Sequence, residues 1–251
     1  MLIFIFSLLF PERPLSPQVI MGSHIATYNS PLAVFYQPAL LPGKLSFAFT
    51  YTKPYEGLPI NFFESAVSFP LFKLNLGLGF SYFGEEIYKE NLAILSLSYK
   101  NSLFSVGSNL KLLSLYIPEV ISHNEPSLDF GTVLFFPFDI KIGAFTRNFY
   151  RSKNFKTDIP SLFALSFGVT HKTLEFFFDL LSEENHPFTY SIGFKINILK
   201  SFYLRGGLKS EEKILGVGFG INPGFVSLEG FYRVHPFLGS SFALSISFYK
   251  N

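Results

Sequence analysis

The stretch from Phe72 to Phe83 alternates strictly between apolar side chains and small or polar ones. Successive side chains of a β-strand point to opposite faces, so this period predicts a strand with one apolar face. Its length, and the aromatic residues at both ends of the apolar row, are typical of a strand that crosses a bilayer within a barrel. The apolar row consists of Phe72, Leu74, Leu76, Leu78, Phe80 and Tyr82.

The same alternation recurs along the chain and predicts an all-β protein of about fourteen strands. Several of these segments have the roughly 9–11 residues that a tilted membrane crossing requires. The last of them ends two residues before the C-terminus and carries an aromatic residue near its end. The expected strands are 45–52, 61–69, 72–83, 91–99, 102–115, 127–136, 139–149, 161–170, 173–181, 188–198, 201–209, 213–221, 224–233 and 240–249.

The predicted connections alternate in length, with tight turns between longer links. Outer-membrane barrels have short turns at the periplasmic end and longer loops at the outer end, so this alternation predicts a transmembrane antiparallel β-barrel. A soluble β-sandwich is the weaker alternative, since it has no reason to sort its loops by length. The expected tight turns are Pro70-Leu71, Lys100-Asn101, Pro137-Phe138, His171-Lys172, Leu199-Lys200 and Asn222-Pro223-Gly224.

The composition also favours a membrane barrel. Hydrophobic residues make up 48% of the chain and charged residues only 15%, whereas a soluble domain carries about 25% charged residues. The mean hydropathy is +0.32, yet no segment approaches the roughly 20 consecutive apolar residues of a spanning helix. The formal charge of +2 and the absence of a basic cluster argue against nucleic acid as a partner, and the absence of cysteine excludes disulfides and thiol chemistry.

Three parts of the chain are expected. Residues 1–21 are expected to form an export signal, because Met1 to Phe10 is an apolar run like the core of a secretory leader. Residues 22–43 form an N-terminal plug, since they carry no Lys, Arg, Asp or Glu and are rich in proline, so that they suit a barrel lumen better than a strand. Residues 44–251 form the barrel. A short helix is expected after Ser30, and the expected plug residues are Pro31, Phe35, Tyr36, Gln37 and Pro38.

Charged residues fall on the strand face opposite to the apolar rows, which places them in the lumen. Two interpretations are open: a polar pathway or binding patch, and a set of ion pairs that neutralise one another. The expected lumen-facing residues are Lys111, Asp129, Arg147, Glu175, Lys195, Arg205 and Glu229, together with Lys141, Asp179 and Arg233.

One ion pair is predicted specifically. Gly216, Gly218 and Gly220 leave one strand without side chains on its inner face. Arg205 and Glu229 lie on the two neighbouring strands, so their side chains are expected to meet across this bare surface.

Four short motifs occur in a characteristic order: PLAVFYQPA at residues 31–39, SVGSNLK at 105–111, SLDFG at 127–131 and LRGG at 204–207. Together they resemble the PorV/PorQ-like family of FadL-type outer-membrane barrels, with Gln37 standing where that family has asparagine. The resemblance implies a fourteen-stranded barrel with an N-terminal plug in the outer membrane of a Gram-negative-type bacterium. It also implies either transport of hydrophobic small molecules or a role beside the type IX protein-secretion machinery.

The five histidines show neither the arrangement of a catalytic triad nor a metal-binding spacing. We therefore expect a protein that is not an enzyme and needs no cofactor or metal. The leading hypothesis is a channel or transporter for small hydrophobic compounds, with membrane lipids and such a ligand as partners. The alternative is a non-conducting barrel that partners the type IX secretion or surface-attachment machinery.

Overall fold

The computed structural model describes residue 26 and residues 30–57, 59–86, 88–119, 121–151, 160–184, 186–210, 214–235 and 239–250. The expected export signal lies outside these described residues. Among them, no helix is both long and apolar enough to cross a bilayer.

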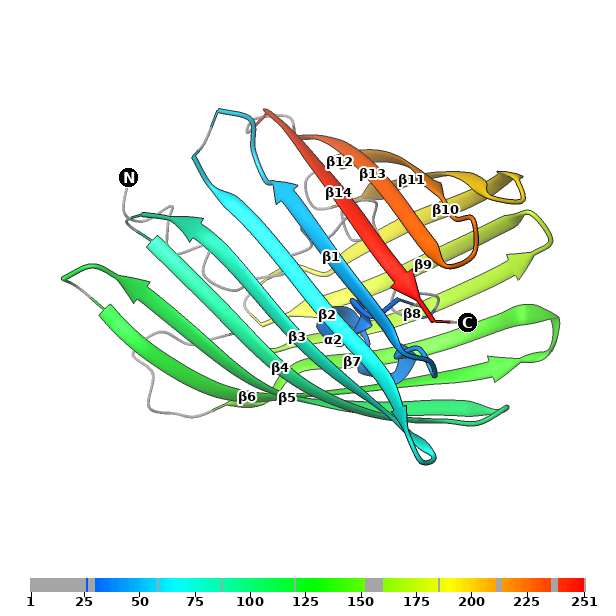
Figure 1. Cartoon of the computed structure of the whole chain (residues 1–251), viewed down its shortest axis with the longest axis horizontal. Coiled ribbons are helices and arrows are strands. Elements are labelled where there is room, and N and C mark those ends of the chain that lie inside the picture. The colour runs from blue at the N-terminus through cyan, green and yellow to red at the C-terminus, as the bar shows by residue number, and fades with distance from the viewer. Residues whose placement is uncertain are drawn as a thin grey trace.

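The described chain forms a closed antiparallel barrel of fourteen strands, as the alternation predicted (Figure 1). Each strand pairs with its neighbours in the sequence, and β1 closes the barrel by pairing with β14 from Ser46↔Tyr249 to Lys53↔Phe242. The strands are β1 (Ser46–Lys53), β2 (Asn61–Leu71), β3 (Leu74–Glu85), β4 (Tyr88–Lys100), β5 (Phe104–Ile117), β6 (Ile121–Phe136), β7 (Ile140–Arg151), β8 (Leu162–His171), β9 (Leu174–Glu183), β10 (Thr189–Leu199), β11 (Phe202–Lys209), β12 (Ile214–Ile221), β13 (Val226–His235) and β14 (Gly239–Tyr249).

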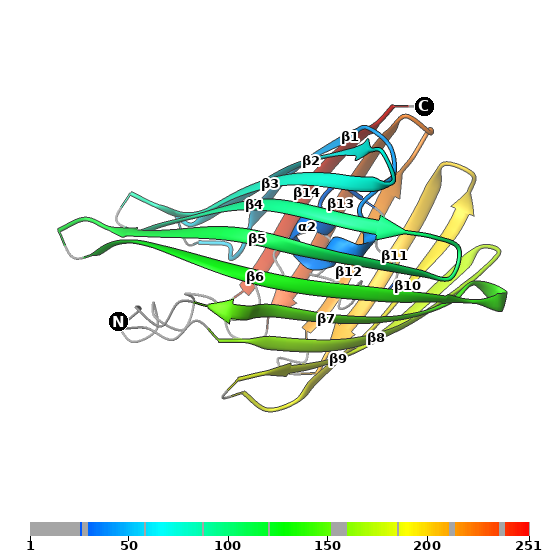
Figure 2. The same ribbon diagram turned by 90° about the horizontal axis from the view of Figure 1, so that it is seen from below.

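Three short helical elements complete the described chain. α2 (Ala33–Tyr36) and η2 (Pro38–Leu40) precede β1 and lie inside the barrel, as two perpendicular views show (Figures 1 and 2). The turn η3 (Pro137–Asp139) connects β6 to β7. The wall is uneven in height, because β5 and β6 have 14 and 16 residues whereas β11 and β12 have 8 each.

The outer surface of the barrel is apolar. Leu78 on β3, Phe130 on β6 and Leu244 on β14 are about half exposed, and similar side chains follow on every strand between them. A continuous apolar band of this kind exceeds the patches of a few hundred Å² that soluble proteins expose. Because the barrel also pairs every strand on both edges, it satisfies its backbone hydrogen bonds without water. The protein is therefore a membrane barrel.

The turn between β2 and β3 differs from the prediction. Pro70 and Leu71, expected to form the turn, are the last residues of β2 and pair with Asn75 and Leu74. The turn consists of Phe72 and Lys73, so Phe72 is not the first residue of the apolar row. The alternation is the same on both sides of the turn and could not locate it. Phe72 has a φ of 55° and its side chain is 99% exposed, an uncommon combination for a bulky residue.

Two inward aromatic rings cover glycines of the neighbouring strand β12. Tyr203 of β11 lies over Gly220, and Phe231 of β13 lies over Gly218. Both rings are almost completely buried. Between them, Nη2 of Arg205 lies 3.3 Å from Oε1 of Glu229, which forms the predicted ion pair. The bare inner face of β12 is therefore filled by side chains from both neighbours.

We predict that the substitution Gly218→Ala lowers the free energy of unfolding by about 1–3 kcal/mol, the usual cost of overpacking. A Cβ atom at this position would lie 2.4 Å from Cδ1 of Phe231 and 2.9 Å from the carbonyl oxygen of Gly230. Urea titration of the barrel in lipid vesicles measures the change.

Gly43→Ala is the matched control, because its Cβ would meet only Oδ1 of Asn75 at 3.6 Å. Equal unfolding midpoints for the two variants would contradict the packing of Phe231 against Gly218.

Candidate functional site

Residues 30–42, called the inner segment below, lie within the lumen and are buried from Ser30 to Pro42. The backbone N–H of Leu32 donates to Oγ of Ser30 at 3.4 Å, and the chain then forms the single turn of α2. The short helix expected after Ser30 is thus present. Prolines at both ends of this stretch prevent a longer helix. The segment has several backbone carbonyls without helical partners, and these groups require donors from the wall.

The wall beneath the inner segment is lined by glycines of three strands. Cβ atoms placed on Gly77 and Gly79 of β3 would come within 2.6 Å of the methyl groups of Val34. A Cβ on Gly107 of β5 would lie 2.5 Å from the carbonyl carbon of Pro38. A Cβ on Gly131 of β6 would likewise overlap the side chain of Gln37. The glycines therefore provide the space in which the inner segment lies.

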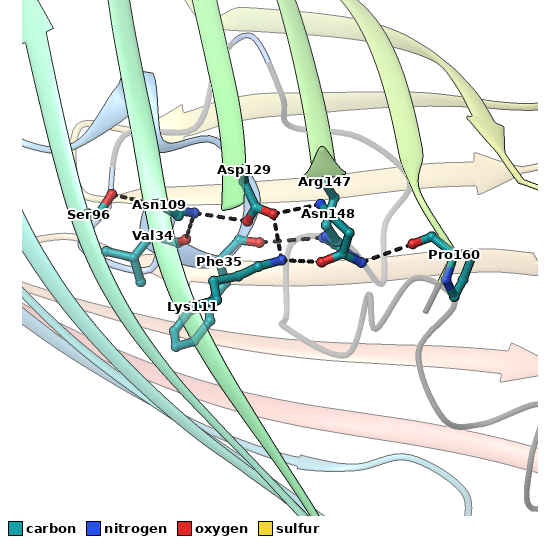
Figure 3. A network of polar contacts seen from close by, with 9 residues as sticks. All are labelled: Val34, Phe35, Ser96, Asn109, Lys111, Asp129, Arg147, Asn148 and Pro160. Carbon is teal, nitrogen blue, oxygen red and sulfur yellow. Dashed lines mark hydrogen bonds and ion pairs between the residues drawn. The ribbon is translucent and has the colours of Figure 1, made fainter. Parts of the chain in front are cut away.

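Polar side chains of the wall bind the carbonyls of the inner segment (Figure 3). Nδ2 of Asn109 donates to the carbonyl of Val34 at 2.8 Å. Nη2 of Arg147 lies 3.4 Å from the carbonyl of Phe35. Oγ of Ser105 donates to the carbonyl of Ala39. Three carbonyls that the short helices leave unpaired are thus satisfied by two strands, β5 and β7.

Two inner-segment side chains also bind the wall. The hydroxyl of Tyr36 donates to Oε1 of Glu64 on β2. Nε2 of Gln37 donates to the carbonyl of Ala144 on β7 at 3.1 Å. Gln37 thereby adds a second contact between the inner segment and β7, beside that of Arg147. Its Oε1 atom is buried and has no hydrogen-bond partner among the described residues.

An irregularity between β6 and β7 builds the charged part of the site. Asp129 of β6 lies opposite a bulge of three residues of β7, Arg147, Asn148 and Phe149, where the register shifts. Asn148 has a φ of 55°, which asparagine tolerates better than most residues. The side chains of Arg147 and Asn148 both line the lumenal cavity, whereas regular alternation would send one of them outward. A β-bulge that redirects side chains is a common feature next to functional sites.

Lys111 is at the centre of a buried network (Figure 3). Its Nζ atom lies 2.5 Å from Oδ1 of Asp129 and donates to Oδ1 of Asn148 at 2.7 Å. The backbone N–H of Asn148 donates to the same carboxylate at 2.9 Å, and Asn109 donates to Oδ2 at 3.2 Å. Asp129 thus accepts three donors, which compensates for its burial. Because Asn109 also binds Val34, the network connects the bulge to the inner segment.

A cavity of about 70 Å³ lies between the inner segment and the longer-loop halves of β2–β7. Phe35 and Tyr36 of the inner segment form one side. Its other lining residues are both apolar and charged, namely Phe62, Leu92, Ile94, Leu113, Glu64, Ser81, Lys111, Ser127, Asp129, Arg147 and Asn148. For comparison, a dry apolar cavity of about 150 Å³ binds benzene. The cavity is therefore too small for a monoaromatic ring in this conformation.

Seven of the ten predicted lumen-facing residues divide into two groups; of the others, Asp179 and Arg233 are buried, and Lys141 lies opposite the inward Phe135. Lys111, Asp129 and Arg147 meet at the cavity. Glu175 pairs with Lys195 at 2.9 Å on β9 and β10, and Arg205 pairs with Glu229 on β11 and β13. These four residues are not among those that line the cavity. The interpretation as neutralising pairs thus fits three pairs, while Arg147 has no carboxylate partner within the described part of the chain.

Sequence reasoning did not identify Glu64, Asn109 and Asn148 as site residues. Glu64 and Asn109 occupy inward positions of their strands, so the alternation contained the signal for both. Asn148 breaks the alternation, and only the bulge turns it inward. The described residues contain no group of three or more His, Cys, Asp or Glu that could hold a metal ion.

No family model and no curated protein matches the chain. Solved structures do resemble it. The monoaromatic hydrocarbon channel CymD has a TM-score of 0.66 at 14% identity, over 96% of this chain and 98% of that one. The toluene transporter TodX of Pseudomonas putida has 0.64 at 11%, over 97% and 98%. A FadL homologue of Pseudomonas aeruginosa has 0.64 at 11%, over 95% and 98%.

At these identities the similarity concerns the fold. The chain has the fold of FadL-type outer-membrane barrels, which fits the apolar exterior and the closed strand order. CymD is a channel and TodX is a transporter, and the fold that this chain shares with them is that of barrels of the Gram-negative outer membrane. The closer likeness to PorV/PorQ proteins stays a prediction.

We predict that Asp129→Asn lowers the free energy of unfolding by about 3–5 kcal/mol, because it leaves the buried Lys111 ammonium without its counter-ion. Guanidinium unfolding in vesicles measures the loss. Replacement of both partners, as Lys111→Met with Asp129→Asn, should recover much of it.

Glu175→Gln is the comparison, since its pair with Lys195 is partly exposed, at 21% and 17%. Exposed pairs contribute about 1 kcal/mol or less. A loss as large as that of Asp129→Asn would show that burial of the Lys111 pair is not decisive.

Proposed function

We propose that the protein is an outer-membrane channel for small hydrophobic compounds, closed by the inner segment. The observation that carries this proposal is the inner segment itself, which is buried in the lumen next to a half-apolar cavity. The fold shared with hydrocarbon channels supports it. In the proposed channel, as in outer-membrane barrels generally, the short turns face the periplasm and the longer loops face the outside.

The cavity lies on the longer-loop side of the inner segment, so a compound from outside reaches Phe35 and Tyr36 first. Because the cavity holds less than a monoaromatic ring, binding requires Phe35 and Tyr36 to move. That movement strains the contacts from Arg147 to Phe35 and from Tyr36 to Glu64. Release of these contacts displaces the inner segment and opens a path toward the periplasm. Ligand binding then stabilises the open state by its differential affinity.

The second candidate is a non-conducting barrel beside the type IX secretion machinery. A lumen closed by the inner segment would suit that role too. The observation that favours this candidate is the resemblance of residues 31–39 to the PorV/PorQ-like family. Under this alternative the inner segment stays in place and hydrophobic compounds do not cross. The two experiments below therefore distinguish the candidates. That the protein is not an enzyme stays a prediction.

Deletion of residues 22–43 should produce a measurable conductance in a planar bilayer, because it removes the structure that fills the β3–β6 side of the lumen. Gly107→Ala should give brief openings with the chain intact, since its Cβ would displace the backbone at Pro38 and Ala39. Gly43→Ala is the control that leaves the inner segment in place. If both the deletion variant and Gly107→Ala stay closed in these recordings, while heat-modifiable migration shows that their barrels are folded, the inner segment does not close the barrel.

A disulfide tests whether the inner segment moves during transport. The ideal Cβ of Gly79 lies 2.6 Å from Cγ2 of Val34, so the Cβ atoms of the two positions lie within about 4 Å, the range of a disulfide. The chain has no other cysteine. Cells that carry Val34→Cys with Gly79→Cys should take up the dye N-phenyl-1-naphthylamine only after reduction.

Each single-cysteine variant is the control for this pair and should respond to neither oxidant nor reductant. Equal uptake by the oxidised and reduced pair would exclude movement of the inner segment. No uptake by the unaltered protein above that of cells without it would exclude the channel and favour the secretion role.

A further inference from the structure

The end of the barrel that carries the short turns is strongly cationic. Seven lysines lie in these turns, at the adjoining strand ends or beside the two ends of the barrel sequence, and six of them are exposed. One acid, Asp139, lies in the same turns. None of the seven forms an ion pair within the described residues. The lysines, called the short-turn lysines below, are Lys44, Lys73, Lys100, Lys141, Lys172, Lys200 and Lys250.

The opposite rim has the reverse charge. Its described acids outnumber its described lysines by six to three. The acids are Glu56, Glu85, Glu86, Glu119, Glu183 and Glu184, and the lysines are Lys53, Lys89 and Lys209. The cationic character is therefore specific to one end of the barrel and does not follow from the overall charge of +2.

Large apolar side chains accompany the short-turn lysines. Phe72 is 99% exposed and Phe138 is 88% exposed, each at the tip of its turn. Both adopt positive φ, at 55° and 63°, where glycine or asparagine would be less strained. Leu103, Leu199 and Phe225 are also exposed in or beside three other short turns. Exposed apolar side chains next to lysines are the combination that binds a membrane interface.

Lys44 and Lys100 lie over the inward rings of Tyr249 and Phe135, and Lys141 lies opposite Phe135, so these three lysines are on the lumenal side. We propose that the remaining short-turn lysines, Lys73, Lys172, Lys200 and Lys250, and the apolar turn residues bind the anionic head groups of phospholipids in the adjoining leaflet. These four lysines are exposed at the turns after β2, β8 and β10 and at the end of β14, so they are spread around the barrel. A lipid annulus also surrounds it, whereas a protein partner would favour a patch on one side. Lysine side chains reach head groups by extending along the apolar surface. Each lysine near an anionic surface contributes about 1 kcal/mol, or about fivefold in binding.

The inference concerns the short-turn rim of the barrel and does not depend on the channel proposal. The test uses the absence of tryptophan from the chain. Phe72→Trp places a single reporter at the short-turn rim, and Phe188→Trp places one at the opposite rim, where Phe188 is 79% exposed. Each full-length variant is reconstituted in vesicles of phosphatidylcholine with brominated phosphatidylglycerol or brominated phosphatidylcholine, and quenching gives the relative binding of the two lipids.

Phosphatidylglycerol should bind about fivefold more strongly than phosphatidylcholine at Trp introduced for Phe72. The preference should disappear in 1 M salt, which screens charges beyond about 3 Å. Lys73→Gln with Lys250→Gln in the same reporter should abolish it in low salt. The reporter at position 188 should show no preference. Both reporters sense the leaflet around their own rim, so mixed insertion directions do not affect the result.

Equal quenching by the two lipids at position 72 in low salt would overturn the proposal and leave an acidic periplasmic protein as the partner of this rim. A preference that persists in 1 M salt or after the lysine substitutions would overturn it as well, because the short-turn lysines would not be its cause. Heat-modifiable migration of every variant shows that the barrel is folded in each comparison.

Discussion

The structure depends on one constraint: within a bilayer, every backbone N–H and C=O must find a partner in the protein. A sheet meets this constraint only by closing, and here the closing pair is β1 with β14. Closure then determines the rest. It fixes which side chains face lipid and which face inward, and it creates a lumen whose contents must satisfy their own polar groups. The inner segment can occupy that lumen only because Asn109, Ser105 and Arg147 supply donors for its carbonyls.

The same constraint explains why the lumen combines glycine, aromatic rings and paired charges. A glycine gives space to whatever lies against it: the inner segment on β3, β5 and β6, and an aromatic ring on β12. A charge in the lumen is tolerated when a partner is fixed beside it, as for Lys111 and Asp129. Arg147 is the exception at the cavity, since its hydrogen bond goes to a backbone carbonyl of the inner segment. It is therefore the charged group that the proposed movement of the inner segment would affect most directly.

The barrel could be predicted from the sequence because alternation, loop lengths and composition all follow directly from closure in lipid. The ion pair of Arg205 and Glu229 could be predicted as well, since the glycines of β12 leave only one place for both side chains to meet. Two other features could not be predicted from the sequence. The turn at Phe72 and Lys73 has no distinguishing residue, because the apolar row continues into it. The bulge at Arg147 and Asn148 interrupts the alternation, so a reading based on that period cannot place Asn148 in the lumen.

The inner segment enters β1 through a short connection, from Gly43 to Leu45. Three residues span at most about 11 Å, so in the proposed channel an inner segment that left its place would stay near the mouth of the lumen. Its return would then be an intramolecular step, with the effective concentration in the millimolar range that short tethers give. On that proposal the barrel would close again without any other molecule, and its open time would depend on how long a bound compound holds the inner segment aside.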